Sequence, residues 1–163
     1  MPYFKDYTSQ LGTFYLRASD TALTGLAFTP YAYADESPGS NDILSLTEKW
    51  LNIYLSGEEP DFMPPLELTG TPFQKEIWQR LLAIPYGRSV TYGEIAREMA
   101  EKRGLARMSA QAVGQAVGAN PIAILVPCHR VLGKDGALTG YAGGIKLKET
   151  LLNMEGNHEL STR

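Results

Sequence analysis

One cysteine, Cys128, and one of only two histidines, His129, stand side by side in the segment Pro127–Val131. A thiol is a nucleophile once it is deprotonated, and a nearby imidazole is a common base for that step. Such a base needs an orienting partner, often a carboxylate, and Glu155 is the candidate. These residue types point to nucleophilic thiol chemistry. The alternative is that Cys128 is a small buried apolar residue without a chemical role.

The segment around Cys128 is expected to form a corner. An apolar run, residues 122–126, precedes it and predicts a strand or extended segment, and residues 133–136 are typical of a turn. Adjacent residues of an extended chain point to opposite sides. The chain must therefore bend between Cys128 and His129, or a water must link the two side chains.

Glu155 is expected in the last turn of a helix over about residues 145–155, with Leu147, Leu151 and Met154 facing inward and Gly156 as its cap. An acid at that end opposes the helix dipole by roughly half a kcal/mol. It is either a surface residue of no consequence or a residue held there by a partner such as a histidine cation.

The composition limits the class of protein. The chain of 163 residues is 44% hydrophobic, enough for a core, and its single cysteine excludes an internal disulfide. No signal peptide and no stretch of membrane-spanning length is visible, so we expect a soluble, cytoplasmic protein. Residues 1–70 carry a net charge of −7 and residues 71–163 carry +4. This asymmetry suits a second half that faces a polyanion, or it is a chance imbalance on two solvated faces.

The first half predicts a small α/β domain over residues 1–66, with a linker to about residue 70. A β-hairpin is expected from residues 13–18 and 23–28, and an amphipathic helix from residues 43–55. Residues 58–65 are acidic and rich in proline, as a linker would be. Nothing in this half carries recognisable chemistry.

The second half, residues 71–163, predicts a helical domain with clear helix starts. Thr71 and Thr91 each begin a capping box, and Ser109 can cap a third, short helix of small residues from Ala110. The two helices after Thr91 suggest a helix-turn-helix, although a plain helical hairpin has the same pattern. Basic side chains that could contact phosphates lie in and around it, namely Arg88, Arg97, Lys102, Arg103, Arg107, Arg130 and Lys134.

Several ordered motifs in this half closely resemble O6-alkylguanine-DNA alkyltransferases, the methylated-DNA–protein-cysteine methyltransferases. They are Asn120-Pro121, Pro127-Cys128-His129-Arg130-Val131, Gly140-Tyr141-Ala142-Gly143-Gly144, Lys148, and Leu151-Leu152 ahead of Glu155. The resemblance is specific over residues 71–156. Over residues 1–70 it rests on layout alone, a small α/β domain before a helical one.

The resemblance implies a ribonuclease-H-like N-terminal domain and a C-terminal domain that carries the helix-turn-helix and the active site. Cys128 would accept the alkyl group, His129 would be its base through a water, and Glu155 would orient His129. Asn120 would hold the turn that gathers these groups. Tyr92 would give a proton to N3 of the base as the alkyl group leaves.

The same resemblance implies that the damaged guanine is flipped out of double-stranded DNA into a pocket. The backbone of Val131 would read its exocyclic amine, and Tyr141 and Ala142 would close over O6. The helix that begins at Ser109 and Ala110 would enter the minor groove. Gln111 occupies the position at which the best-known members carry an intercalating arginine. We also expect DNA contacts from Arg130, and from Arg103 or Arg107 in a segment, residues 101–107, that is longer than in those members.

Alkyl transfer to sulfur forms a thioether, which is not readily hydrolysed, and no second thiol could regenerate the first. We therefore expect a monomer that acts once, with no metal or cofactor. Two alternatives stay open: a Cys-His-Glu thiol hydrolase, and a module that recognises alkylated DNA without transfer. A metal site is disfavoured because His158 lies in a polar tail, away from the adjacent pair Cys128 and His129.

Overall fold

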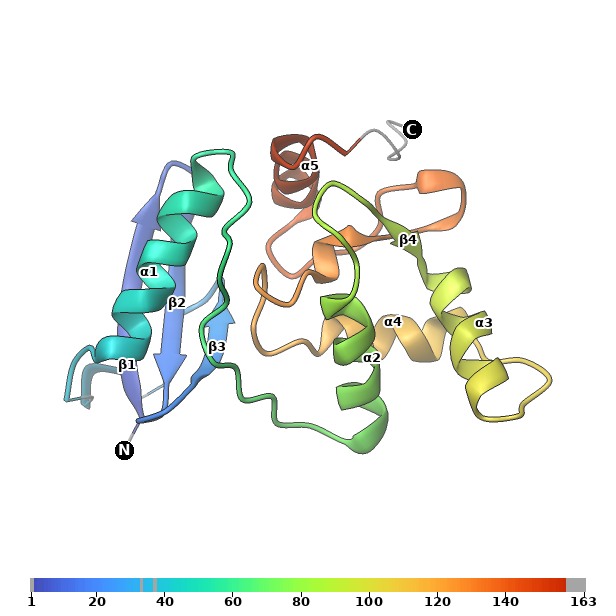
Figure 1. Ribbon diagram of the computed structural model, residues 1–163, viewed down its shortest axis with the longest axis horizontal. Coiled ribbons are helices and arrows are strands. Elements are labelled where there is room, and N and C mark those ends of the chain that lie inside the picture. The colour runs from blue at the N-terminus through green and yellow to red at the C-terminus, as the bar shows by residue number, and fades with distance from the viewer. Residues whose placement is uncertain (1, 33, 37, 158–163) are drawn as a thin grey trace. The chain divides into compact units, whose positions relative to one another are not determined.

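The computed structural model describes residues 2–32, 34–36 and 38–157 (Figure 1). The chain forms two compact units. One contains residues 1–69 together with 121–125, and the other contains residues 70–120 and 126–163. The expected domains, 1–66 and 71–163, stay a prediction. None of the helices in the described residues is long and apolar enough to cross a membrane.

The first unit is built on a three-stranded antiparallel sheet in the order β1-β2-β3. Its strands are β1 (Tyr3–Ser9), β2 (Gly12–Ala18) and β3 (Leu23–Ala27). Alternate residues of β2 (Phe14, Leu16 and Ala18) are buried, as a strand with one covered face requires. The predicted hairpin is confirmed. Strand β1 was not anticipated, because Lys5 and Asp6 interrupt its apolar pattern, which an edge strand tolerates.

Helix α1 (Asp42–Leu55) runs along one face of this sheet (Figure 1). The Asn41 side chain caps it by accepting a hydrogen bond from the Leu44 backbone nitrogen at 3.0 Å. Its apolar stripe (Leu44, Trp50, Leu51 and Tyr54) is buried. The predicted helix is confirmed, and the short 3₁₀ turn η1 (Ala34–Glu36) precedes it.

Residues 121–125 belong to this first unit although they lie late in the chain. The Leu26 nitrogen donates to the Pro121 carbonyl at 3.0 Å, and the Ala123 nitrogen donates to the Leu26 carbonyl at 3.2 Å. Ile124 then adopts a left-handed backbone conformation, with φ 72°. Of the predicted strand or extended segment, Ile122 and Ala123 form bridge residues beside β3, a turn follows at Ile124 and Leu125, and Val126 is again a bridge residue.

The second unit contains four helices among the described residues. They are α2 (Pro72–Leu82), α3 (Tyr92–Lys102), α4 (Ala110–Gly118) and α5 (Ile145–Met154). Two-residue strands, β4 (Val90–Thr91) and β5 (Val131–Leu132), pair in parallel and were not predicted. Two 3₁₀ turns, η2 (Cys128–Arg130) and η3 (Lys134–Gly136), flank β5. The coarse prediction, a small sheet with a helix followed by a helical region, is thus confirmed.

The helix starts follow the expected capping. Thr71 forms a complete capping box with Gln74, and Thr91 accepts a hydrogen bond from the Glu94 nitrogen at 3.0 Å. Ser109 caps α4 through the Ala112 nitrogen at 3.0 Å. The small residues of α4 allow α2 to approach closely. The Trp78 indole of α2 donates a hydrogen bond to the Ala116 carbonyl of α4 at 2.8 Å.

Candidate active site

The chain bends at Cys128 as the sequence required. Cys128 begins turn η2, and its backbone nitrogen donates to the Val126 carbonyl at 2.8 Å. The same carbonyl accepts a hydrogen bond from the Asn120 side chain at 2.8 Å. The Val131 backbone nitrogen donates a hydrogen bond to the Cys128 carbonyl. Asn120 therefore holds the turn that presents Cys128 and His129.

The residue Cys128 is 8% exposed. Burial raises its pKa, because a thiolate is poorly solvated in an apolar site. Hydrogen bonding from Asn120 and the charge of Lys148 act in the opposite direction. The resting sulfur is accordingly a thiol at neutral pH, and it needs a base to become a nucleophile.

His129 and Glu155 form the expected pair. The His129 Nε2 lies 2.7 Å from the Glu155 Oε2, and neither side chain is exposed. Burial lowers the pKa of His129 despite the nearby carboxylate, and the positive charges of Arg130 and Lys148 lower it further. We therefore assign a neutral imidazole that donates from Nε2 to the carboxylate, which makes Nδ1 the basic nitrogen.

Glu155 stays ionised although it is buried. Burial by itself would raise its pKa, but the hydrogen bonds and charges of His129 and Arg130 prevail and bring it to about 2. Its Oε1 also accepts from the Gly87 backbone nitrogen at 3.3 Å. These donors explain how an acid persists at the C-terminal cap of α5, against the helix dipole.

Arg130 lies where the sequence did not place it. Its Nε donates to Glu155 Oε1 at 2.8 Å, its Nη2 to Glu155 Oε2 at 3.1 Å, and its Nη1 to the Ile84 carbonyl at 2.8 Å. The side chain is 11% exposed. All three nitrogens of its guanidinium bond to the protein, and the expected DNA contact by Arg130 stays a prediction.

A second cation, Lys148 of α5, is buried beside the site. Its Nζ donates to the Thr139 carbonyl at 3.3 Å and lies 5.8 Å from the centre of the Tyr92 ring. Burial lowers the pKa of Lys148 to about 8. The negative charge that Cys128 can carry raises this pKa and so partly offsets the effect of burial. The inward face of α5 is thus Lys148, Leu151 and Leu152, rotated from the predicted stripe, in which Leu147 and Met154 prove only half-buried.

A cavity of about 630 Å³ opens between α3, α4 and the loop after β5. Tyr92 and Thr139 form part of its wall, so it borders the environment of Lys148. Of the predicted site residues, Tyr92, Ala110 and Gln111 line it, and Ser109 caps the helix beside them. The full lining is Thr91, Tyr92, Gly93, Arg97, Ala110, Gln111, Gly114, Gly133, Lys134, Asp135 and Thr139.

Three further predicted site residues, Tyr141, Val131 and Ala142, are not among the residues that line this cavity. The Tyr141 ring lies edge-on to His129, with ring centroids 6.4 Å apart, and burial raises its pKa well above the ordinary value. Val131 is buried and pairs with Val90. Ala142 is exposed on the loop before α5.

The sequence did not predict that Arg130 and Gly87 bind Glu155, or that Lys148 is buried beside the site. A lysine three and four residues before Leu151 and Leu152 lies on the apolar face of its helix, and this was a readable signal for burial. Gly87 gave no comparable signal. Within the residues that the structure describes, no group of three or more His, Cys, Asp or Glu side chains could hold a metal ion, and His158 lies outside them.

Comparison with known proteins agrees with this geometry. Residues 72–157 match the profile of the 6-O-methylguanine DNA methyltransferase, DNA binding domain. A methylated-DNA–protein-cysteine methyltransferase of Mycobacterium tuberculosis strain H37Rv is 41% identical over 161 residues, covering 95% of this chain and 93% of the relative.

Two solved structures from M. tuberculosis are also similar. The crystal structure of its O6-methylguanine methyltransferase has a TM-score of 0.81 and 38% identity, covering 100% of this chain and 97% of the other. A structure of the M. tuberculosis protein in complex with DNA has a TM-score of 0.77 and 40% identity, covering 94% and 92%.

Proposed function

The chain belongs to the 6-O-methylguanine DNA methyltransferase family, and we propose that it repairs O6-alkylguanine in double-stranded DNA by irreversible transfer of the alkyl group to Cys128. The observation that carries this proposal is the buried Cys128, which adjoins a base, His129, already oriented by Glu155. A thiol hydrolase has no comparable support.

The chemistry follows from the hydrogen-bond pattern. Nε2 of His129 is held by Glu155, so Nδ1 takes the Cys128 proton, through a water. The thiolate attacks the alkyl carbon, the carbon–O6 bond breaks, and its electron pair passes to guanine. Tyr92 supplies a proton to N3, and the proton on His129 restores Tyr92. One proton leaves sulfur and one reaches guanine at N3, and its exchange through water to N1 restores the ordinary form of guanine, so the products are a thioether and guanine.

DNA would be bound by a helix-turn-helix formed by α3 and α4. The exposed residues of α4 at its start, Ala110 and Gln111, are small or uncharged, which suits close approach to the minor groove. The target guanine, flipped from the duplex, would enter the cavity that Tyr92 lines. Val131, Tyr141 and Ala142 would contact the base through their backbone.

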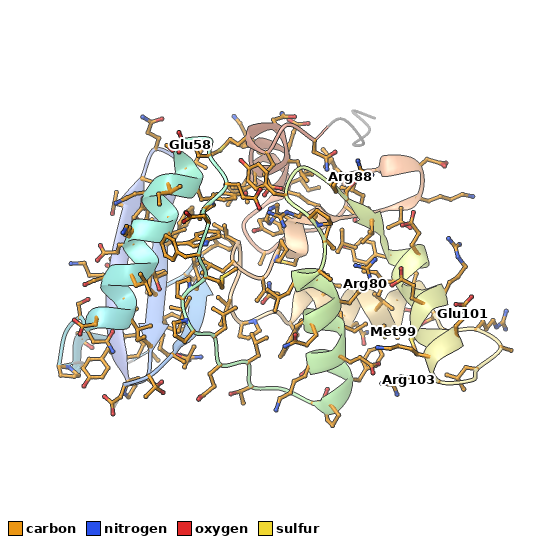
Figure 2. The ribbon with its side chains drawn as sticks, viewed as in Figure 1. Glu58, Arg80, Arg88, Met99, Glu101 and Arg103 are labelled. Atoms are coloured by element: carbon orange, nitrogen blue, oxygen red, sulfur yellow. The ribbon has the colours of Figure 1, made fainter. Side chains whose placement is uncertain are left out.

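The longer segment between α3 and α4 would add phosphate contacts. Arg103, labelled in Figure 2, is engaged by the protein, because its Nη2 lies 3.0 Å from Glu76 Oε1 and its guanidinium lies 5.1 Å from the centre of the Phe73 ring. Arg107 is exposed. We therefore assign the phosphate contact to Arg107.

The finer features of the fold belong to the same proposal. The N-terminal sheet and helix would be a ribonuclease-H-like domain, with a linker to about residue 70. The protein would act as a cytoplasmic monomer, needing neither metal nor cofactor for the transfer. Each molecule would act once, because a thioether is stable in water and the chain has one cysteine.

The test is the intact mass of the protein after mixing with a duplex that carries one O6-methylguanine. We expect a gain of one methyl group per molecule on Cys128 and no further turnover. The Cys128→Ser variant should gain nothing. Tight binding without a mass gain would replace the proposal with a recognition module, and neither binding nor gain would revive the thiol hydrolase.

A further inference from the structure

Arg130 occupies a position that the alkyl transfer itself does not explain. It follows the reactive pair directly in turn η2, and its guanidinium forms a two-point contact with the Glu155 carboxylate. Each carboxylate oxygen therefore binds Arg130, while Oε2 also binds His129. Two cationic or potentially cationic groups share one buried anion.

This sharing adds to burial in favouring the neutral form of His129. A buried carboxylate 2.7 Å from an imidazole would by itself favour the protonated ring. A permanent guanidinium on the same carboxylate already balances that anion, so a second positive charge has no counterion. Lys148, on the other side, acts in the same direction. His129 consequently rests as a neutral base.

Arg130 also joins three segments that meet at Glu155. Its Nη1 binds the Ile84 carbonyl at the end of α2, and its guanidinium lies 5.7 Å from the centre of the Tyr86 ring. Gly87, in the same loop, donates its backbone N–H to Glu155. The guanidinium thus links the Glu155 carboxylate both to turn η2, which carries Arg130, and to the segment after α2, which supplies the Ile84 carbonyl.

We propose that Arg130 is a positioning residue for the alkyl transfer, which holds the Glu155 carboxylate against His129 Nε2 and keeps the imidazole neutral and able to accept the Cys128 proton. The inference rests on the proposed function. It assigns Arg130 to the reaction through Glu155, and it removes Arg130 from the DNA contacts.

The direction of the effect follows from the groups around His129. They are Cys128 and Arg130 in turn η2, Glu155 and Lys148 from α5 and its cap, and Tyr141 from the loop before α5. Removing the charge of Arg130 takes one positive charge away from the Glu155 carboxylate, so the imidazole should hold a proton to higher pH. A protonated imidazole cannot take the thiol proton, and transfer should slow most at low pH.

The experiment measures the single-turnover rate of methyl transfer by intact mass between pH 5.5 and 9, for the full chain and for Arg130→Gln and Arg130→Lys. Arg80→Gln is the matched control, because Arg80 forms the same two-point contact with Glu98, at 2.6 and 3.1 Å, on the surface of α2 (Figure 2). Rates from single turnover do not depend on the folded fraction, which the final mass gain reports.

For Arg130→Gln we expect a rise of about one unit in the pH at which half the maximal rate is reached, and therefore a rate that is lower by up to about tenfold at pH values below both midpoints. Arg130→Lys keeps a charge and loses the two-point geometry, so its midpoint should stay near that of the wild type while its rate falls. Arg80→Gln should match the wild type. In a Glu155→Gln background, Arg130→Gln should not move the midpoint further.

A direct readout is available because the chain has two histidines, and ¹⁵N spectra can follow the His129 ring. The ring should become protonated at a pH about one unit higher in Arg130→Gln than in the wild type. An unchanged pH midpoint and an unchanged ring spectrum in Arg130→Gln would overturn the inference. If Arg130→Gln does not fold, a wild-type rate in Arg130→Lys overturns it, and a slowed rate supports it. A wild type that takes up no methyl group would instead refute the proposed function.

Discussion

The ammonium group of Lys148 lies 5.8 Å from the centre of the Tyr92 ring, on a side chain that has no surface exposed to solvent. Its hydrogen bond goes to a carbonyl, that of Thr139, and no carboxylate is paired with it in the described residues. A buried lysine without an anionic partner destabilises the native state, and the sulfur of Cys128 is the group that can become its anion. The site therefore holds a positive charge in advance for the thiolate.

The first prediction is that Lys148→Met stabilises the protein and slows the transfer. The pKa of Lys148 falls from 10.5 to about 8 in the folded chain, which corresponds to about 3 kcal/mol of destabilisation while the group is charged in both states. The wild type should thus gain stability as pH rises from 8 to 10.5. The advantage of Met should be largest below pH 8 and disappear above about pH 10.5, in urea unfolding at several pH values. A lower stability than the wild type at pH 7 would refute this account.

The second prediction concerns acid. The pKa of Glu155 falls from 4.5 to about 2 on folding, so its ionised form contributes about 3 kcal/mol at neutral pH. Because the folded pKa is the lower one, this stability should be present above about pH 4.5 and be lost as the pH falls towards 2. The lowered pKa of His129 acts in the same direction, since protonation is disfavoured in the folded chain. Glu155→Gln should lose most of this pH dependence in urea unfolding, whereas Glu98→Gln, in the exposed pair with Arg80, should retain it.

The third prediction tests Gln111. An arginine at this exposed position would add one phosphate or base contact. We expect Gln111→Arg to raise affinity for duplex DNA and to make the logarithmic salt slope steeper by about one. Its transfer rate should rise on a duplex with O6-methylguanine and stay constant on the free base, because the thiol chemistry is untouched. An equal rise on both substrates would show that Gln111 acts on the reactive site.

The fourth prediction concerns the loop that holds Glu155. Gly87 has φ 80°, and a Cβ there would lie 3.0 Å from the Glu155 carbonyl oxygen. Gly104 has φ 65° with no atom within 4 Å of the same position, so it is the matched control. Both alanine variants should lose about 1 kcal/mol from backbone strain. Gly87→Ala alone should also slow transfer, because Glu155 must shift; equal transfer rates in the two variants would contradict this.

Much of the fold was readable because the relevant signals are local. Thr71, Thr91 and Ser109 cap helices with their own side chains, and the hairpin strands alternate in the expected way. The short parallel pair of Val90 with Val131 was not readable, since it depends on residues far apart in the chain. Strand β1 was missed because charged residues obscure its pattern.

The site was readable to a similar degree. Residue chemistry and the family resemblance brought His129 and Glu155 together, and the structure places them 2.7 Å apart. The same reasoning assigned Arg130 to DNA, since an arginine in a basic region looks like a phosphate contact. In the structure the Arg130 guanidinium binds Glu155, which is 25 residues away in the chain and comes close to it only on folding. The catalytic roles themselves stay predictions.

The return of residues 121–125 to the N-terminal sheet has a consequence for synthesis. Leu26 exchanges backbone hydrogen bonds with Pro121 and Ala123, so that unit is complete only when the chain has been made past residue 125. Residues 1–69 leave the exit tunnel of the ribosome well before residues 121–125, with which they pair, are exposed. The outer edge of β3 at Leu26 therefore stays unpaired during synthesis until residues 121–123 emerge, which is only shortly before the reactive cysteine does.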